Sequence, residues 1–102
     1  MARFDIYRNP GDARVVPYLL DVQSDLLADV TTRVVVPLYF AKRFGRPARR
    51  LNPVFEIEGH AVVMSTAELA GVMPSDLGER VASLEQHSDA IRDALDFLFQ
   101  GY

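Results

Sequence analysis

The longest helical pattern in the chain is Ser83-Leu-Glu-Gln-His-Ser-Asp-Ala-Ile-Arg-Asp-Ala-Leu-Asp-Phe-Leu-Phe99. Ser83 and Gln86 form a capping-box pattern, which marks the start of a helix, and Gly101 is a typical helix stop. The apolar residues of this segment recur at the spacing of one helical face, and they are Leu84, Ile91, Ala94, Leu95 and Leu98. The sequence therefore predicts one helix from Ser83 to Phe99, about 25 Å long at 1.5 Å per residue.

The segments that precede this helix favour strands. Apolar and charged residues alternate from Arg3 to Arg8, and Asn9-Pro-Gly-Asp12 follows as a strong turn signal. The return strand of this predicted hairpin runs from Val15 to Val22. Pro17 has no N–H to donate, so it predicts a sheet edge or a bulge at that point.

Further strands are predicted in the middle of the chain. Val34-Val-Val-Pro-Leu38 is a continuous, mostly β-branched run, which predicts a strand buried on both faces, with Pro37 at its end or at a bulge. Val54–Ile57 and His60–Ser65 flank Glu58-Gly59 and form a second predicted hairpin. Four or five strands are therefore expected before any helix.

The region between the strands and the helix gives weaker signals. Thr66–Ala70 is suited to one capped helical turn, and the residues from Gly71 to Gly78 are expected to be irregular around Pro74. Strands first and one helix last predict an α+β or mainly β fold, in which the helix packs on a small, strongly bent sheet.

The end of the predicted helix carries more apolar surface than one helical face can bury. Phe97 and Phe99 diverge from the core stripe at about 100° per residue, and Tyr102 lies beyond the helix stop. One interpretation is that these aromatic residues cover a neighbouring sheet or a second copy of the chain. The alternative is a recognition site for another protein.

Length and composition indicate one globular domain covering residues 1–102, with 49% apolar and 25% charged residues. The chain has no cysteine, which excludes disulfides, thiolate metal sites and thiol catalysis. The first residues are too charged for a signal peptide, and no apolar run approaches the ~18 residues of a membrane span. We therefore expect a cytoplasmic protein that does not contact a membrane.

The net charge of −3 is unevenly distributed along the sequence. Residues 1–55 contain nine Lys or Arg and five Asp or Glu, whereas residues 56–102 contain two and nine. Five basic residues fall in Lys42-Arg-Phe-Gly-Arg-Pro-Ala-Arg-Arg50, where glycine and proline predict a loop. This basic loop is either simply solvated or binds a partner, for which an acidic peptide suits an acidic protein better than a phosphate backbone.

Few residues are arranged for catalysis. His60 is expected at a hairpin turn, and the pair Ser83 and His87 lacks an orienting third group, so neither predicts a metal site or a nucleophile. Asp21 and Asp25 are better suited to satisfying backbone groups in a turn than to acid–base chemistry. We therefore expect no catalytic residue, metal or cofactor.

One catalytic alternative stays open on the sequence alone. Arg33 with Ser65 or Thr66 is similar to the cation and hydroxyl set of small ribonucleases, which must hold a phosphate. The sequence does not show whether these side chains meet.

Short motifs recur along almost the whole chain in a recognisable order. They are Phe4 with Tyr7, Asp21-Val-Gln-Ser-Asp25, Arg33 through Val36-Pro37-Leu38, Pro53-Val54 with Ile57, Gly78-Glu79 with Val81, and Phe99 with Gly101. In this order they resemble the CcdB toxins of bacterial toxin–antitoxin modules.

The resemblance implies a mainly β (α+β) fold, an SH3-like antiparallel barrel of the CcdB and MazF type with an additional small sheet and a C-terminal helix. It also implies a homodimer that is not an enzyme. Such toxins bind the A subunit of DNA gyrase and trap the cleaved gyrase–DNA complex. A CcdA-like antitoxin with a disordered segment neutralises them, so DNA is reached only through antitoxin or gyrase.

The resemblance also implies a binding surface. Carried over by position, the gyrase-binding residues are Phe4, Tyr7, Ser24, Leu26, Leu27, Asp96, Phe99, Gln100, Gly101 and Tyr102. The antitoxin-binding residues are expected to be Leu26, Leu27, Arg43, Arg46, Arg49, Phe99 and Gln100.

The carried-over surface departs from the family at its end. Leu26 and Leu27 replace a pair of isoleucines, Asp96 replaces an asparagine, and Gln100-Gly-Tyr102 replaces Trp-Gly-Ile. The family's tryptophan stacks on an arginine of gyrase, and glutamine has no π face for this contact. This change keeps open a decayed homologue that still binds antitoxin and represses its operon. The barrel shared with MazF keeps open a MazF-like endoribonuclease in which Arg33 or the basic loop holds phosphate.

Overall fold

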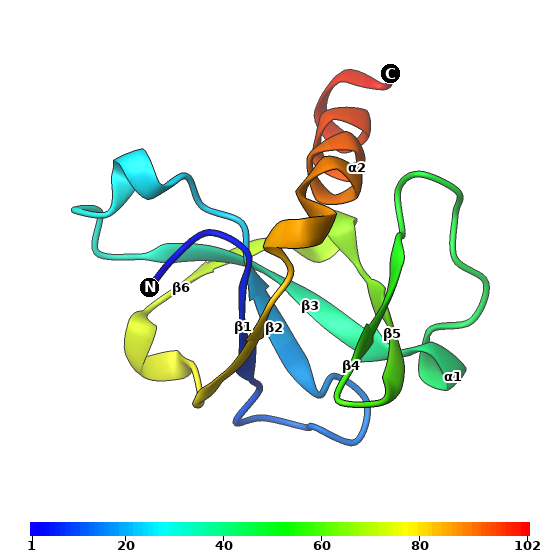
Figure 1. Cartoon of the computed structure of the whole chain (residues 1–102), viewed down its shortest axis with the longest axis horizontal. Coiled ribbons are helices and arrows are strands. Elements are labelled where there is room, and N and C mark those ends of the chain that lie inside the picture. The colour runs from blue at the N-terminus through cyan, green and yellow to red at the C-terminus, as the bar shows by residue number, and fades with distance from the viewer.

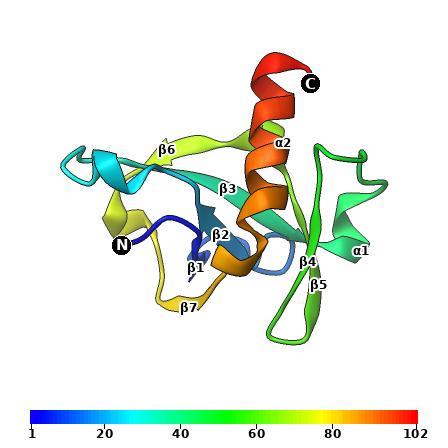
Figure 2. The same cartoon turned by 45° about the horizontal axis from the view of Figure 1, so that its top comes forward.

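One curled antiparallel sheet and one long helix make up the fold (Figures 1 and 2). The computed structural model describes residues 1–102. The strands are β1 (Asp5–Arg8), β2 (Tyr18–Asp21), β3 (Arg33–Phe40), β4 (Val54–Ile57), β5 (His60–Met64), β6 (Ala70–Val72) and β7 (Arg80–Ser83). The α-helices are α1 (Ala41–Phe44) and α2 (Ser88–Gln100), and short 3₁₀ turns are η1 (Asp25–Leu27), η2 (Thr66–Glu68), η3 (Pro74–Asp76) and η4 (Glu85–His87). The predicted α+β class, a strongly bent sheet with one helix packed on it, is confirmed.

The strands follow the order β4-β5-β3-β2-β1-β7, and β6 also pairs with β3. β3 is therefore the centre of the sheet. Its first residues, Arg33–Val35, pair with β6, and its last, Leu38–Phe40, pair with β5. Because two different strands leave the same side of β3, the sheet divides there and curls. The additional small sheet that we expected is thus continuous with the rest through β3.

Both predicted hairpins are confirmed. β1 pairs with β2, and β4 pairs with β5 around Glu58-Gly59, whose φ angles of 53° and 80° are those of a tight hairpin turn. The prediction for Pro17 was wrong. β2 begins one residue later, at Tyr18, and lies between two strands rather than at an edge, so the proline simply precedes the ladder.

Pro37 does not end its strand, which was predicted to stop at Leu38. β3 continues to Phe40, and Pro37 pairs in register with Leu19. Its carbonyl accepts from the N–H of Ser65, the residue after β5. The missing N–H of Pro37 therefore faces the point where β5 has ended and β6 has not begun, and no ladder bond is lost there.

The strands β6 and β7 were not predicted, and the chain has seven strands rather than four or five. Each has only three or four residues and forms through pairing with β3 or β1. Gly78 leads into β7, where its N–H donates to the carbonyl of Arg8 at 2.9 Å. A Cβ at Gly78 would lie 2.7 Å from that oxygen, so the close approach requires glycine. The predicted turn at Thr66 exists as η2, although Ala70 already belongs to β6.

The long helix starts five residues later than predicted. Ser83 belongs to β7, where it pairs with Asp5, and the N–H of Leu84 donates to Phe4. These bonds hold the backbone extended, and the Ser83 hydroxyl accepts from Glu85 within a local turn instead of capping a helix. The predicted stop is confirmed, because Gly101 is left-handed (φ 79°) and its N–H donates to the carbonyl of Phe97.

The hydrophobic core lies between the sheet and the first half of α2. Ile91 and Ala94 of the helix are fully buried, and Leu95 packs partly against the same cluster. The sheet contributes the other large side chains, among them Ile6, Tyr18, Leu20, Val36, Leu38, Val62 and Met64. Both views show the second half of α2 projecting from the sheet (Figures 1 and 2). The helix is 13 residues long, and no helix of the structure has the length and apolar character needed to cross a membrane.

A polar cluster on the side opposite the helix end joins both hairpins. The Tyr18 hydroxyl donates to Glu58, and Arg8 bonds Glu58 and Glu79 at 2.8 Å each. The Tyr18 hydroxyl and then Arg8 lower the pKa of Glu58. A carboxyl with a lowered folded-state pKa stabilises the fold above its ordinary range, and this contribution is lost as the pH falls through the folded pKa.

Tyr18→Phe is therefore expected to lower the melting temperature by about 4 °C at neutral pH, the lower end of what one hydrogen bond contributes in a domain of this size, because this bond is only partly buried. The difference from wild type should shrink in acid, as Glu58 takes up a proton. Thermal unfolding from pH 3 to pH 7 measures it. Tyr39→Phe, which removes a hydroxyl bond to Glu68 at an exposed site, is the control. A pH-independent difference would contradict the assigned role of Glu58.

Candidate binding surface

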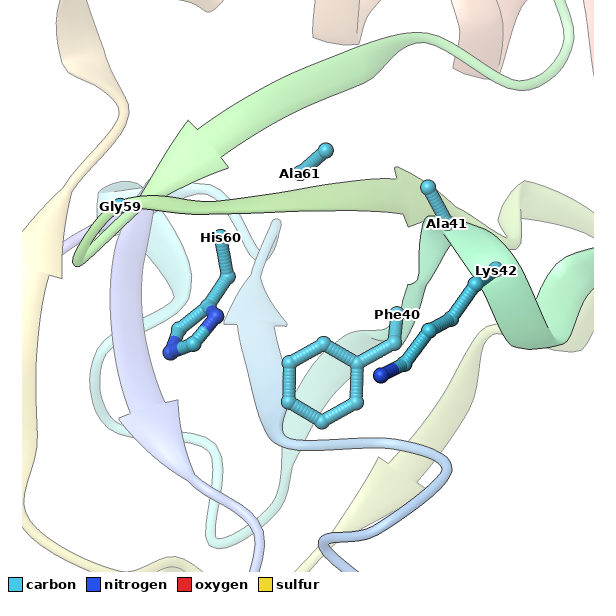
Figure 3. A pocket seen from close by; sticks show the side chains of 6 residues that line it. All are labelled: Phe40, Ala41, Lys42, Gly59, His60 and Ala61. Atoms are coloured by element: carbon cyan, nitrogen blue, oxygen red, sulfur yellow. The ribbon is translucent and has the colours of Figure 1, made fainter.

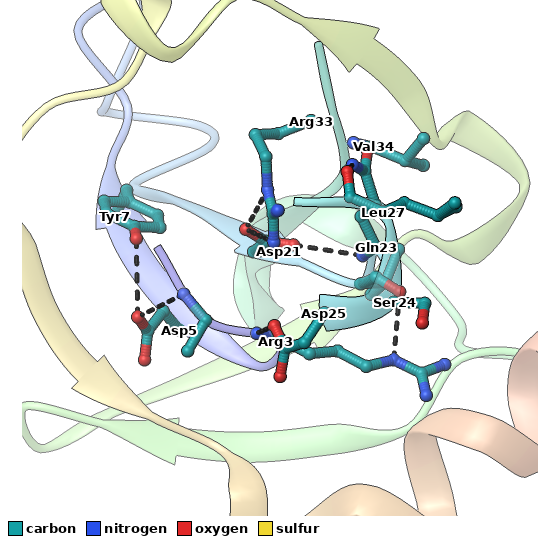
Figure 4. Close-up of polar contacts among 12 residues, drawn as sticks. Arg3, Asp5, Tyr7, Asp21, Gln23, Ser24, Asp25, Leu27, Arg33 and Val34 are labelled. Carbon is teal, nitrogen blue, oxygen red and sulfur yellow. Dashed lines mark hydrogen bonds and ion pairs between the residues drawn. The ribbon is translucent and has the colours of Figure 1, made fainter. Parts of the chain in front are cut away.

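A buried ion pair lies beneath the turn that follows β2 (Figure 4). The side chains of Arg33 and Asp21 are 4% and 0% exposed, and Nε of Arg33 donates to Oδ2 of Asp21 at 2.8 Å. The other carboxylate oxygen of Asp21 accepts the N–H of Gln23 at 3.0 Å. Burial raises the pKa of Asp21, and the bond from Arg33 opposes this rise. Both carboxylate oxygens of Asp21 are thus bound by neighbouring groups. As the sequence predicted, Asp21 is better suited to holding the turn than to acid–base chemistry.

The same network fixes the backbone of the turn. Gln23 accepts the N–H of Val34 and donates to the carbonyl of Leu27, both at 3.0 Å. The Ser24 hydroxyl accepts the N–H of Leu26 and so caps η1. Asp25 accepts the N–H of Arg3 at 2.8 Å. Polar side chains hold the backbone from both sides and leave the apolar ones to face outward.

The turn presents large apolar side chains to solvent. Leu26 is 95% exposed, Leu27 is 52% exposed, and Val30 is about equally exposed. The polar turn therefore buries neither of its two adjacent leucines. Such surface is a typical feature of a binding site.

An apolar groove of about 430 Å³ connects this turn to the end of α2. Its walls include Leu27 and Val30 from the turn, Leu69 after η2, and Leu95 and Phe99 from the helix. The sequence placed Leu27 and Phe99 on one surface only through the resemblance, and the structure brings both side chains to one cavity. Val30, Leu69 and Leu95 were missed as site residues, since Val30 and Leu69 belong to no motif and Leu95 was assigned to the core face of the helix.

The end of α2 stands beside the groove. Phe99 and Tyr102 are 70% and 76% exposed, and Asp96 and Gln100 are exposed as well. Phe97 points elsewhere: the guanidinium of Arg50 lies 4.8 Å from its ring centre. Both phenylalanines lie outside the core cluster, as predicted, and only Phe99 lines the groove.

Two of the gyrase-binding residues implied by the resemblance have little solvent-exposed surface. Phe4 is 4% exposed and Tyr7 is 7% exposed. The Tyr7 hydroxyl donates to Asp5, and burial raises the pKa of Tyr7. Both aromatic side chains lie beneath the surface formed by their neighbours, so any part they take in binding is through the residues they support.

The comparison with protein families agrees with this geometry. A family model described as CcdB protein matches residues 3–101 of the 102-residue chain. The chain belongs to the CcdB family. Members of the CcdB family are toxins of toxin–antitoxin modules, and this general function follows for the chain from a match over almost its whole length.

The basic loop lies away from the exposed leucines. Arg43 is exposed on α1, and Arg46 and Arg49 are exposed on the segment between α1 and β4. Both views place this segment on one side of α2 and the turn of Leu26 and Leu27 on the other (Figures 1 and 2). The structure therefore does not bring the three arginines together with the leucines. Arg50 is committed elsewhere, because it pairs with Asp93 of α2 at 2.8 Å.

A separate hollow of about 380 Å³ lies where β3 ends and β5 begins (Figure 3). Phe40 and His60 face each other there edge to face, with ring centres 5.3 Å apart, and Lys42 lies beside them. His60 directly follows the Glu58-Gly59 turn, as predicted. None of the residues carried over from the CcdB family lines this hollow.

The candidate catalytic pairs are not assembled. Ser83 lies on β7 and His87 in η4, so they do not share a helix. Arg33 is buried against Asp21, the Ser65 hydroxyl donates to Glu68, and the Thr66 hydroxyl donates to the carbonyl of Leu51. Arg33 and the two hydroxyls are each bound to another group, so this particular set is not assembled in the structure.

Proposed function

We propose that this CcdB-family toxin binds the A subunit of DNA gyrase, traps the cleaved gyrase–DNA complex, and is neutralised by a cognate CcdA-like antitoxin. The observation that supports this most is the continuous apolar surface formed by Leu26, Leu27, the groove and Phe99. Exposed leucines and an exposed helix end are ordinary anchors for a protein partner. The toxin acts by binding and not as an enzyme.

The toxin is proposed to act as a homodimer. Membership of the CcdB family supports a dimer, and a domain of 102 residues has a modest core to which an interface would add stability. Sedimentation equilibrium between 1 and 100 μM tests this directly. A monomer throughout that range would contradict it.

The antitoxin is proposed to bind as an extended segment that passes around α2. The molecule measures 36 × 32 × 22 Å, and about 12 extended residues span roughly 40 Å. One such segment reaches both the exposed leucines and the basic loop with Arg43, Arg46 and Arg49. Acidic residues in the segment would then pair with the loop.

Expression in a gyrase-sensitive bacterial host tests the main proposal. Growth should stop, and covalent gyrase–DNA complexes should accumulate; co-expressed antitoxin should restore growth. Unimpaired growth without trapped complexes would refute gyrase poisoning. If the protein still bound its antitoxin in that case, it would be a decayed toxin that no longer poisons gyrase. Gln100, which stands in place of the family's tryptophan, favours this alternative.

Gly101→Glu is expected to abolish killing and leave the fold intact. The left-handed backbone at Gly101 disfavours any side chain by about 1 kcal/mol, and a negative charge at a helix C-terminus is unfavourable. Both effects redirect Tyr102, but no atom lies within 4 Å of a Cβ at this position, so the core is undisturbed. Growth assays and circular dichroism measure the two results.

Gly101→Asn is the matched control, because asparagine tolerates the left-handed conformation and adds no charge. It should keep most of the killing activity. Equal loss in both variants would mean that the position has no tolerance for a side chain at all, and equal retention would remove the helix end from the proposed site.

A further inference from the structure

Two arginines from distant parts of the sequence converge on one phenylalanine. The guanidinium carbon of Arg3 lies 4.8 Å from the ring centre of Phe4, and that of Arg92, on α2, lies 5.9 Å from the same centre. Phe4 is 4% exposed, so its ring is a fixed platform. Nε of Arg3 also donates to the carbonyl of Val22 at 3.1 Å, which holds its guanidinium in place.

Neither guanidinium has a hydrogen-bonded carboxylate. Asp25 accepts from the backbone N–H of Arg3, and Asp89 lies 3.7 Å from Arg92 with a fully exposed side chain. Most other arginines in contact with the sheet or helix are paired closely: Arg8, Arg33 and Arg50 reach carboxylates at 2.6 to 2.8 Å. Two like charges are thus held on one ring, and the only carboxylate paired with either of them lies 3.7 Å away, beyond hydrogen-bond distance.

A hollow of about 300 Å³ opens between these arginines. Its lining also includes Ser24, Asp25, Leu26 and Glu85. A space of this size is at the lower limit for a small-molecule site, and it accommodates the end of one side chain. Ser24 lines this hollow as well as the apolar groove, so the two cavities are adjacent.

We infer that Arg3 and Arg92, which lie against the ring of Phe4, form a subsite for a carboxylate, and that it receives an acidic side chain of the gyrase A subunit, the target proposed to dock on Leu26 and Leu27. Guanidinium groups bind carboxylates through paired, charge-assisted hydrogen bonds. The identity of the partner rests on the proposed function, whereas the subsite itself does not. It also gives the buried Phe4 a role in binding as the platform for both cations.

The surroundings favour a carboxylate over a nucleic acid phosphate. Asp25 and Glu85 border the hollow, and the adjacent helix carries Asp89, Asp93 and Asp96. A phosphate backbone would bring many negative charges against these carboxylates, on a protein whose net charge is already −3. One acidic side chain brings a single negative charge into the hollow, so the repulsion is smaller than for a phosphate backbone.

Titration with glutarate, an analogue of a glutamate side chain, tests the subsite. The arginine Nε–H signals are followed by ¹⁵N NMR on the whole protein. The signals of Arg3 and Arg92 should shift together and saturate, and either Arg92→Gln or Arg3→Gln should weaken binding at least tenfold. Arg92 is exposed, so its replacement leaves the fold intact. Arg14→Gln, which removes an arginine at 90% exposure, is the control and should change nothing.

Three results would overturn the inference. They are shifts that do not saturate, equal shifts at Arg14, and tighter binding of inorganic phosphate than of glutarate in a parallel titration. The outcome is independent of the growth assay. Saturable binding of glutarate by a protein that neither kills nor binds gyrase would retain the subsite and refute the proposed partner.

Discussion

Gln100→Trp is expected to strengthen binding to the gyrase A subunit by up to about thirtyfold and to increase killing of a gyrase-sensitive host. Gln100 is the last residue of α2 and is exposed next to Phe99. In the CcdB family a tryptophan at this position stacks on an arginine of gyrase. An aromatic–cation contact contributes about 1 to 2 kcal/mol, and every 1.4 kcal/mol changes the affinity tenfold.

The matched control is Gln100→Leu, which adds apolar area but no π system. Titration of a gyrase A fragment with wild type and both variants separates the two contributions, and growth assays follow the consequence in cells. If the tryptophan variant binds gyrase no more tightly than the leucine variant, an aromatic ring at position 100 does not contribute to the affinity. A wild-type toxin as potent as Gln100→Trp would mean that Tyr102 already supplies the aromatic contact.

The parts of the fold that the sequence predicted are those that local signals determine. Glu58-Gly59 and Asn9–Asp12 specify their turns through residues that adopt these conformations readily, and both hairpins exist. The strands β6 and β7 have three or four residues and no alternation, and they form only because β3 and β1 offer free edges. The same pairing overrode the capping-box signal at Ser83, because tertiary hydrogen bonds outweigh a weak local preference.

The candidate site was predicted in part for a similar reason. The exposed leucines stand out as adjacent apolar residues in a polar turn, whereas the groove depends on the packing of α2 against segments far away in sequence. The sequence contains an indication of the ion pair between Arg33 and Asp21. An arginine opens an otherwise apolar strand, and Asp21 pairs with Val35, so the two charged residues lie diagonally on one face of the sheet.

Arg33→Leu is expected to destabilise the fold by about 3 to 5 kcal/mol at neutral pH, because removing one partner of a buried ion pair leaves the other charge uncompensated. This is a large part of the ~5 to 15 kcal/mol that holds a typical domain together. Asp21 remains fully buried, and without the opposing bond from Arg33 its pKa rises further. Urea unfolding at pH 4.5 and pH 7.5 measures the loss.

The loss should be smaller at pH 4.5 than at pH 7.5. A carboxyl with a raised folded-state pKa keeps its proton in the folded protein at a pH where the unfolded chain has lost it, so stability falls as the pH rises through that interval. Asp21→Asn/Arg33→Leu removes both charges but keeps an oxygen for the N–H of Gln23. The double variant should recover part of the stability and lose the pH dependence. Equal destabilisation of Arg33→Leu at both pH values would contradict this account, and the loss would then reflect the packing of the arginine stem.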